Sequence, residues 1–278
     1  KVTDRVPPPQ RVDMKTVFSG VSKSGNASLR RLAKSLQWRQ LYQNSDEYLL
    51  EWTCEEPIRL RQVLNGETCG VGTGANCWPA ANVLARYLLQ RYGETGLSGL
   101  RAIDVGAGTG AVGICAALLG ATVTLTDQKN VRFLMEDNAV TTQKRFGLPD
   151  DQIRVEVLDW DASVARLGPP FDLVLVSDCI LPKLYPIEPL VRTLAALLCG
   201  EGDGKCSLAT KLSESRSPPP VALVSYEHRP FHLYDPRSEF RRLLSNCSLR
   251  VIREVPLAEQ DPVYCSEEIT IFEIGPAS

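Results

Sequence analysis

Apolar and polar positions alternate along this chain in blocks that predict strands and helices in turn. From about residue 100, short β-prone apolar runs are followed by longer stretches that suit helices, an order typical of a parallel sheet covered by helices on both faces. Strands are expected at 100–105, 121–126, 153–158, 171–177 and 221–226, and helices at 111–119, 131–146, 187–198 and 236–245. Two final strands, at 249–255 and 269–274, have no helix between them and should pair antiparallel.

The first third of the chain follows a different pattern. Residues 1–45 are polar and contain three consecutive prolines, so we expect a loosely ordered N-terminal arm. Two short strands at 47–52 and 58–63 are expected to form a hairpin, and a helix should follow at 80–92. The folded domain is therefore expected to cover residues 46–278.

A glycine-rich turn follows the first parallel strand, where residues 104–110 read Asp-Val-Gly-Ala-Gly-Thr-Gly. Gly106, Gly108 and Gly110 let the backbone turn tightly and approach a ligand that a Cβ would block. The helix that follows leaves unpaired N–H groups at its N-terminus, facing such a ligand. Asp127 ends the next strand, where a carboxylate suits the two hydroxyls of a ribose. This layout predicts a site for a nucleoside-containing cofactor.

Two cofactor classes fit the turn. Residues 106–111 and 108–113 both match the dinucleotide pattern of an NAD(P)-dependent enzyme, although such a match is weak evidence alone. Asp104 favours S-adenosylmethionine, because a carboxylate there can accept from the amino group of the methionine portion but would repel a pyrophosphate. The antiparallel strand pair at the end of the chain favours the same cofactor. A glycine turn that only permits close packing is the remaining alternative.

The rest of the site is expected beyond the carboxyl ends of the parallel strands, where open α/β sheets bind their ligands. Asp159 can accept from an adenine amino group, and Trp160 offers a flat apolar face for the adenine ring. Trp78, just before the first helix, is expected to cover the other face. The candidate cofactor-binding residues are Trp78, Asp104, Gly106, Ala107, Gly108, Gly110, Asp127, Asp159, Trp160 and Ser177, and Asp178 and Glu227 lie at the same edge.

Composition narrows the class of protein. The net charge of −2, without a sustained basic run, gives no electrostatic footprint for nucleic acid, and no apolar run could cross a bilayer. Nine cysteines lack any C-x-x-C pair, and only two histidines are present, so we expect reduced thiols in a cytoplasmic protein and no metal site. No long apolar stripe remains unused, and a monomer is expected. Residues 200–220, rich in Gly, Ser and Pro, should form a flexible insert.

Several segments together resemble a known family. They are Cys-Trp-Pro-Ala-Ala at 77–81, the glycine turn at 104–113, Thr-Asp at 126–127, Ser-Asp-Cys-Ile at 177–180, Ser-Tyr-Glu-His-Arg at 225–229 and the closing hairpin at 255–269. With them, residues 48–275 resemble the seven-β-strand protein-lysine methyltransferases of the methyltransferase-16 group, and within it the subgroup that acts on valosin-containing protein. The resemblance implies a seven-stranded, mostly parallel, Rossmann-like sheet with an antiparallel C-terminal strand pair.

The resemblance also implies an activity. The glycine loop, Asp127, Trp160 and Trp78 would hold S-adenosylmethionine, and Asp178 would lie beside the channel for the lysine ε-amine of a protein substrate. An AAA ATPase or chaperone-type protein would be that partner. Asp178 is expected to orient the ε-ammonium by a hydrogen bond, and Glu227 is a second candidate for binding it.

The chain departs from the family at one place. The group has Asp-x-x-Tyr after the fourth strand, whereas here Leu181 takes the place of the tyrosine and a tyrosine follows only at Tyr185. The aromatic wall of the lysine channel is therefore missing or displaced. A non-catalytic interaction module with this fold, a small-molecule methyltransferase and an NAD(P)-dependent oxidoreductase stay open as alternatives.

Overall fold

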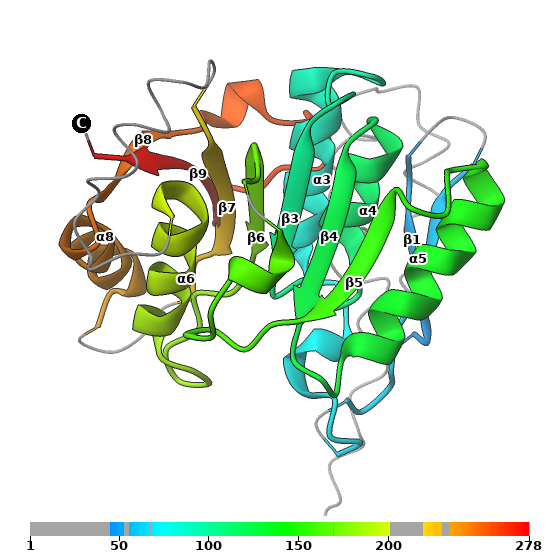
Figure 1. The fold of residues 1–278 in the computed structure, drawn as a ribbon, viewed down its shortest axis with the longest axis horizontal. Helices are drawn as coiled ribbons and strands as arrows, with labels where there is room; N and C mark the ends of the chain where they lie inside the picture. Colours follow the sequence, from blue (N-terminus) through cyan, green and yellow to red (C-terminus); the bar gives the residue numbers. More distant parts are fainter. Residues whose placement is uncertain are drawn as a thin grey trace, which may run out of the picture.

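The computed structural model describes residues 45–52, 56–66, 68–168, 170–200, 219–229 and 234–277. The strands are β1 Glu47–Leu50, β2 Ile58–Arg61, β3 Arg101–Val105, β4 Thr122–Asp127, β5 Ile153–Val157, β6 Leu173–Ser177, β7 Val221–Glu227, β8 Leu249–Glu254 and β9 Ile269–Pro276 (Figure 1). The helices are α3 Pro79–Tyr92, α4 Ala111–Leu118, α5 Arg132–Phe146, α6 Ile187–Cys199 and α8 Pro236–Asn246, with short 3-10 turns η1 Gly72–Ala75, η2 Ala165–Leu167 and η3 Leu257–Glu259.

The main sheet has seven strands in the order β5-β4-β3-β6-β7-β9-β8. The five strands from β5 to β7 are parallel, whereas β9 runs antiparallel between β7 and β8. The predicted seven-stranded, mostly parallel sheet with a closing antiparallel pair is therefore confirmed. Because the strand order reverses between β3 and β6, the carboxyl ends of these two strands open the crevice where such sheets bind ligands.

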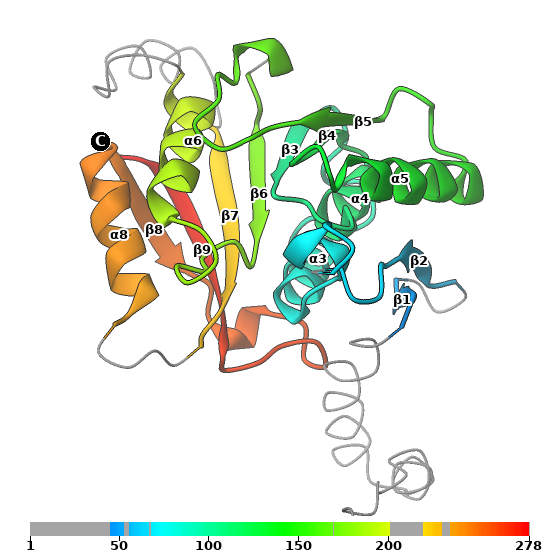
Figure 2. The same ribbon diagram turned by 90° about the horizontal axis from the view of Figure 1, so that it is seen from below.

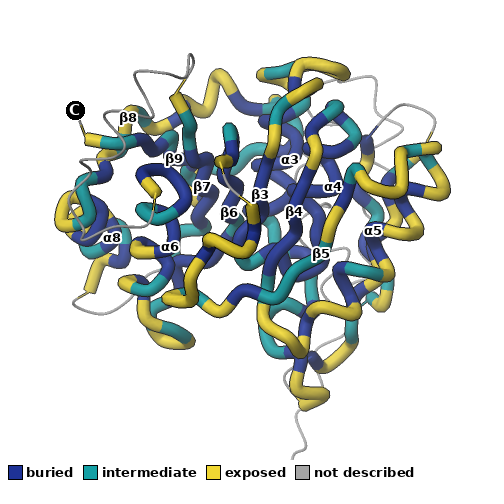
Figure 3. Tube along the Cα trace, viewed as in Figure 1, coloured by how far each residue is buried: buried dark blue, intermediate teal, exposed yellow. Residues whose placement is uncertain are grey.

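Helices cover both faces of the sheet. Helices α3, α4 and α5 pack on one face, and α6 and α8 pack on the other (Figure 2). The central strands β3 and β6 are buried along most of their length (Figure 3), which explains why their sequences are apolar rather than alternating. Two apolar clusters, one on each side of the sheet, form the core.

The predicted hairpin is also confirmed: β1 pairs antiparallel with β2, apart from the main sheet. Buried Asn138 of α5 fastens it. The Asn138 side chain accepts from the Arg61 backbone N–H at 2.6 Å and donates to the Arg61 carbonyl at 3.1 Å and to the Thr109 carbonyl at 2.8 Å. One amide thus ties the hairpin to the glycine turn that follows β3.

Two segments predicted from the sequence lie mostly outside the residues that the structure describes. The N-terminal arm lies outside the described residues except for Ser45, and most of the predicted insert, residues 201–218, lies outside them as well. The division of the chain at residue 46 therefore stays a prediction. In the described ranges, none of the helices combines the length and apolar character that crossing a bilayer requires.

Candidate cofactor and substrate site

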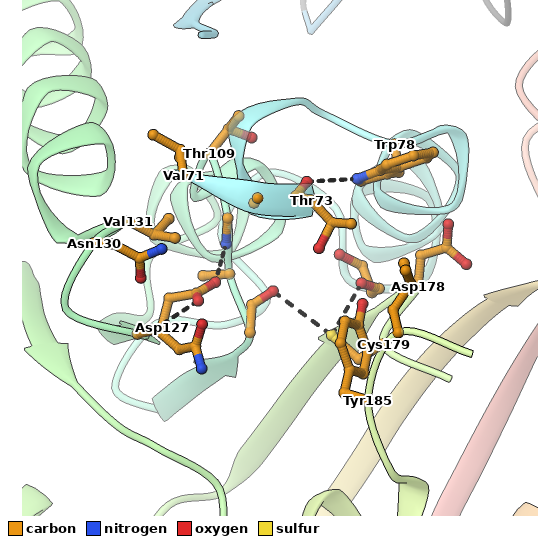
Figure 4. Close-up of a pocket in the computed structure, with 18 of the residues that line it drawn as sticks. Val71, Thr73, Trp78, Thr109, Asp127, Asn130, Val131, Asp178, Cys179 and Tyr185 are labelled. Carbon is orange, nitrogen blue, oxygen red and sulfur yellow. Dashed lines mark hydrogen bonds between the residues drawn. The ribbon is translucent and has the colours of Figure 1, made fainter. Parts of the chain in front are cut away.

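A cavity of about 710 Å³ lies at the carboxyl ends of the parallel strands, within the size range of small-molecule sites (Figure 4). Two glycine-rich segments, at 70–74 and 106–108, form part of its wall. Of the predicted cofactor-binding residues, the structure brings together at this cavity Trp78, Gly106, Ala107, Gly108, Asp127, Asp159, Trp160 and Ser177, and Asp178 lines it with them. The lining does not include Asp104, Gly110 or Glu227.

The glycine loop can adopt its conformation only because two of its residues have no side chain. Gly106 has φ of +70°, and a Cβ there would lie 2.6 Å from the Cys179 Sγ. Gly108 has φ of +56° and faces Gly74, whose carbonyl oxygen would be 3.2 Å from an added Cβ. Glycine at both positions therefore lets the loop pack closely against Cys179 and Gly74 while its backbone lines the cavity. Gly110 caps the start of α4 in a left-handed conformation and acts on the turn rather than at the cavity wall.

Asp127 is held in place by the backbone at the end of β4. Its Oδ2 accepts from the Gly108 N–H at 2.8 Å, and its Oδ1 accepts from the Gln128 N–H at 2.7 Å. Burial raises the pKa of this carboxyl, and the two backbone hydrogen bonds oppose that effect. Since each carboxylate oxygen can accept two hydrogen bonds, both retain an acceptor position for hydroxyls of a ligand.

Asp104 lies beneath the loop rather than in the cavity wall. Its Oδ2 accepts from the Gly113 N–H of α4 at 2.8 Å, and no donor among the described residues reaches its Oδ1. Burial raises the pKa of Asp104 to about 7, although the bond from Gly113 opposes the shift. The predicted contact of Asp104 with a methionine amino group, direct or through water, would have to be made at this buried oxygen.

The raised pKa of Asp104 predicts a pH-dependent stability. An acid whose pKa is higher in the folded state stabilises the fold below its unfolded pKa of 3.8, and this contribution is lost as the pH rises toward 7. Asp104→Asn keeps an acceptor for Gly113 and removes the charge. Without ligand, the variant should match the native chain at pH 4 and exceed it at pH 8, by up to about 4 kcal/mol in the free energy of unfolding. Urea titrations at both pH values measure this, and equal differences at both would contradict it.

The two tryptophans occupy different parts of the cavity. Trp160, which follows β5, packs edge-on against Tyr185 with ring centroids 5.3 Å apart. Trp78 is fixed by a hydrogen bond from its Nε1 to the Thr73 carbonyl at 2.9 Å and lies on the side of Asp178, away from Asp127 (Figure 4). Its ring also faces the guanidinium of Arg229 at 5.5 Å. Trp78 therefore lines the cavity as predicted, but next to the cluster around Asp178.

Asp178 sits at the end of β6 in a left-handed conformation, with φ of +55°, that aspartate tolerates better than most residues. Its side chain is only 1% exposed and forms a two-pronged ion pair with Arg229, at 2.6 Å to Oδ2 and 2.9 Å to Oδ1. Arg229 also binds Glu227 at 3.0 Å, and the Glu227 backbone N–H donates to Asp178 Oδ1 at 3.2 Å. The two predicted catalytic acids are thus joined through one arginine.

Tyr185 is a cavity residue to which the sequence analysis assigned no role. A turn in which the backbone N–H groups of Leu184 and Tyr185 both donate to the Leu181 carbonyl brings Tyr185 to the cavity while Leu181 is buried elsewhere. Burial raises the pKa of Tyr185, and a hydrogen bond with the Thr73 side chain opposes the shift. An aromatic side chain therefore reaches the cavity after β6, from a position later in the chain than Leu181. The only signal in the sequence was the tyrosine itself, four residues late.

Other cavity residues were missed because they lie in a loop before α3. The segment at 70–74 lines the cavity, and Gly74 approaches Gly108 closely. The signal for it in the sequence is its content of three glycines in five residues. In the described part of the chain, no group of three or more His, Cys, Asp or Glu residues is arranged to hold a metal ion.

Comparisons with known proteins agree with this geometry. The model of a family described as lysine methyltransferase matches residues 60–218. The chain is 36% identical to protein N-lysine methyltransferase METTL21A of Danio rerio, over 58% of this chain and 69% of that protein. It is 34% identical to EEF1A lysine methyltransferase 3 of Mus musculus, over 51% of this chain and 57% of that protein. The match thus spans about half to two thirds of these relatives.

Solved structures show the same fold. The chain superposes on SMU.776, a putative methyltransferase complexed with SAH, with a TM-score of 0.50 and 15% identity, over 84% of this chain and 56% of that one. The family match covers more than half of the residues and agrees with the interpretation of the glycine turn as an S-adenosylmethionine site, which the sequence favours. The chain belongs to the lysine methyltransferase family.

Proposed function

We propose that this chain transfers a methyl group from S-adenosylmethionine to the ε-amine of a lysine in a protein substrate. It is an S-adenosylmethionine-dependent enzyme of the protein-lysine methyltransferase class. The observation that carries the proposal is that one cavity unites the bare glycine loop, the fixed carboxylate of Asp127 and the acidic cluster around Asp178.

The residues present fit the cofactor. The loop from Gly106 to Gly108 presents its backbone at the cavity wall, and Asp127 keeps acceptor positions for the ribose hydroxyls. Asp159 and Trp160 would receive the adenine. When bound, the cofactor supplies a methyl group on a positively charged sulfur that leaves as a neutral thioether, so no acid is needed to expel it.

The protein's contribution is positional. The reaction requires nitrogen, methyl carbon and sulfur in line, in a site with little water. The loop after β3 and Asp127 at the end of β4 would hold the cofactor, whereas Trp78 and Asp178, which follows β6, would face the acceptor lysine. An ε-amine that enters beside Asp178 would find a hydrogen-bond acceptor there, after its proton has been lost to water.

Asp127 provides the first test of the cofactor site. We expect Asp127→Ala to weaken binding of S-adenosylhomocysteine by about 1.5–3 kcal/mol for each hydrogen bond lost, roughly 10- to 150-fold. Calorimetric titration of the full chain measures this, with NADH as the control ligand. Unchanged affinity in the variant would refute the ribose assignment, and binding of NADH by the native chain would refute the class of cofactor.

We also propose which class of protein carries the acceptor lysine. An AAA ATPase of the valosin-containing type, or a chaperone-type protein, is proposed on the resemblance of residues 225–229 and the closing hairpin to that subgroup. We further propose that the enzyme is a cytoplasmic monomer. Incubation of a cell lysate with the full chain and tritiated S-adenosylmethionine, followed by mass spectrometry of the labelled protein, tests the substrate. Labelling of an unrelated protein alone would contradict it.

A further inference from the structure

The cluster around Asp178 contains two acids but carries a cation of its own. Arg229 contributes both Nη atoms to Asp178, one of them also to Glu227, and donates to the Glu227 carbonyl at 3.3 Å. Its guanidinium also faces the Trp78 ring. A side chain with this many partners on several sides is fixed in place. The structure therefore places this cation in the site together with both acids.

The ion pair limits what Asp178 can still bind. Its Oδ1 accepts from Arg229 and from the Glu227 backbone, which uses both acceptor positions of that oxygen. Its Oδ2 accepts from Arg229 alone among the bonds that the described residues make with it. One acceptor position therefore remains at Asp178, which is enough to orient one N–H of an incoming amine.

The charges of the cluster add a second constraint. Asp178, Glu227 and Arg229 together carry one net negative charge. A single excess charge attracts a lysine ammonium, but two uncompensated carboxylates would hold its proton, because each nearby opposite charge favours the charged form. Only the neutral amine has the lone pair that attacks the methyl group.

We propose that Arg229 is a positioning residue that balances the charge of Asp178 and Glu227, so that the acceptor lysine can lose its proton near neutral pH. This inference rests on the proposed function. Arg229 itself touches neither cofactor nor methyl group in this account. It acts by aiming Asp178 and by offsetting one of two negative charges.

Other titratable groups around the cluster do not take over this role. Tyr226 from β7, Cys179 and Tyr185 after β6, and Asp127 from β4 interact with the cluster or with one another. Burial raises the pKa of Cys179, Tyr185 and Tyr226, so these groups stay neutral in the range of the test. His228, which adjoins Arg229, and Glu268, beside the β9 residue that pairs with Glu227, are unchanged in every variant below.

The test compares variants that change the net charge of the cluster in opposite directions. Arg229→Met keeps a long stem over Trp78 but leaves two negative charges, and the double variant Arg229→Met with Glu227→Gln restores one. Glu227→Gln alone leaves none, and Arg229→Lys keeps the charge without the two-pronged geometry. For each full-length variant, the rate at which tritiated S-adenosylmethionine labels the acceptor in a clarified lysate is measured from pH 6.5 to 9.5.

We expect the pH profile of Arg229→Met to move upward by about one to three units, with labelling at pH 7.5 at least about tenfold below the native rate. The double variant should recover most of that loss, and Glu227→Gln alone should move the profile downward. Arg229→Lys should keep the native profile at a lower maximum. Affinity for S-adenosylhomocysteine should stay within about threefold in all of them, which also reports that each variant is folded.

Two results would overturn the inference. One is a loss in Arg229→Met that is parallel at every pH and no smaller in the double variant, since this is what damage to the fold alone would cause. The other is an unchanged profile in Glu227→Gln, a variant that leaves the Arg229 pair with Asp178 intact and stays informative if Arg229→Met does not fold. A native chain that labels no protein at any pH would instead overturn the proposed function, and this inference with it.

Discussion

Replacing Asp178 by asparagine should lower the rate of methyl transfer by at least about 100-fold while affinity for S-adenosylhomocysteine stays within about threefold. An asparagine has only one acceptor oxygen, so its NH₂ group would face a donor of the Arg229 guanidinium and break the two-pronged pair. The acceptor amine would then lose its oriented partner. Asparagine tolerates the positive φ of this position, so the backbone should not be strained.

The variant Asp178→Ala serves as the matched comparison. It should lose transfer as well, but alanine lacks the short polar side chain that lets aspartate and asparagine hydrogen-bond locally at φ of +55°, so it adds backbone strain of about 1–2 kcal/mol. Transfer is measured with tritiated S-adenosylmethionine, and binding by calorimetry. If Asp178→Asn lost affinity for the homocysteine compound, Asp178 would belong to the cofactor site rather than to the acceptor site.

Gly106→Ala should abolish cofactor binding, with affinity for S-adenosylhomocysteine falling by at least about 100-fold. A methyl group at this position would lie 2.6 Å from the Cys179 Sγ, in a backbone conformation with φ of +70°. The sulfur has little room to yield, because it lies within 3.8 Å of the Val105 carbonyl oxygen and 3.7 Å of that of Gly106. The loop must therefore shift away from the geometry that leaves space for the ligand.

A substitution at a second glycine serves as a control, because it adds the same backbone strain without the contact with Cys179. Gly147, which caps α5, has φ of +67°, and an added Cβ would meet nothing within 4 Å. Gly147→Ala should therefore lower the free energy of unfolding by about 1–2 kcal/mol and leave the affinity unchanged. Equal losses of affinity in the two variants would show that the effect at Gly106 comes from general destabilisation and not from the cavity.

The parts of the site that follow one another in the chain could be predicted from the sequence. The glycine turn and Asp127 stand at the ends of two successive parallel strands, and such strands place their carboxyl ends together. The pairing of β8 with β9 followed from the absence of a helix between them. In each case the order of strands and helices read from the apolar pattern is enough to say which strands are neighbours.

The parts of the site that depend on the direction of a side chain, or on contacts between distant residues, could not be predicted from the sequence. Asp104 stands two residues before the first glycine, yet its carboxylate meets the N–H of Gly113, because its position in β3 turns it toward α4. Arg229 reaches Asp178 across 51 residues, and nothing in the spacing reveals the pair. Tyr185 enters the cavity only because a turn after Leu181 returns the chain to it.

Whether this cavity methylates a protein lysine can be read from the amino acid that carries the transferred methyl group. The full chain is incubated with tritiated S-adenosylmethionine and a cell lysate, and the labelled protein is hydrolysed to amino acids. We expect the label to elute as methylated lysine, and to disappear with excess S-adenosylhomocysteine and in Asp178→Asn. Label on another amino acid or on a small molecule, or label that persists in Asp178→Asn, would contradict it.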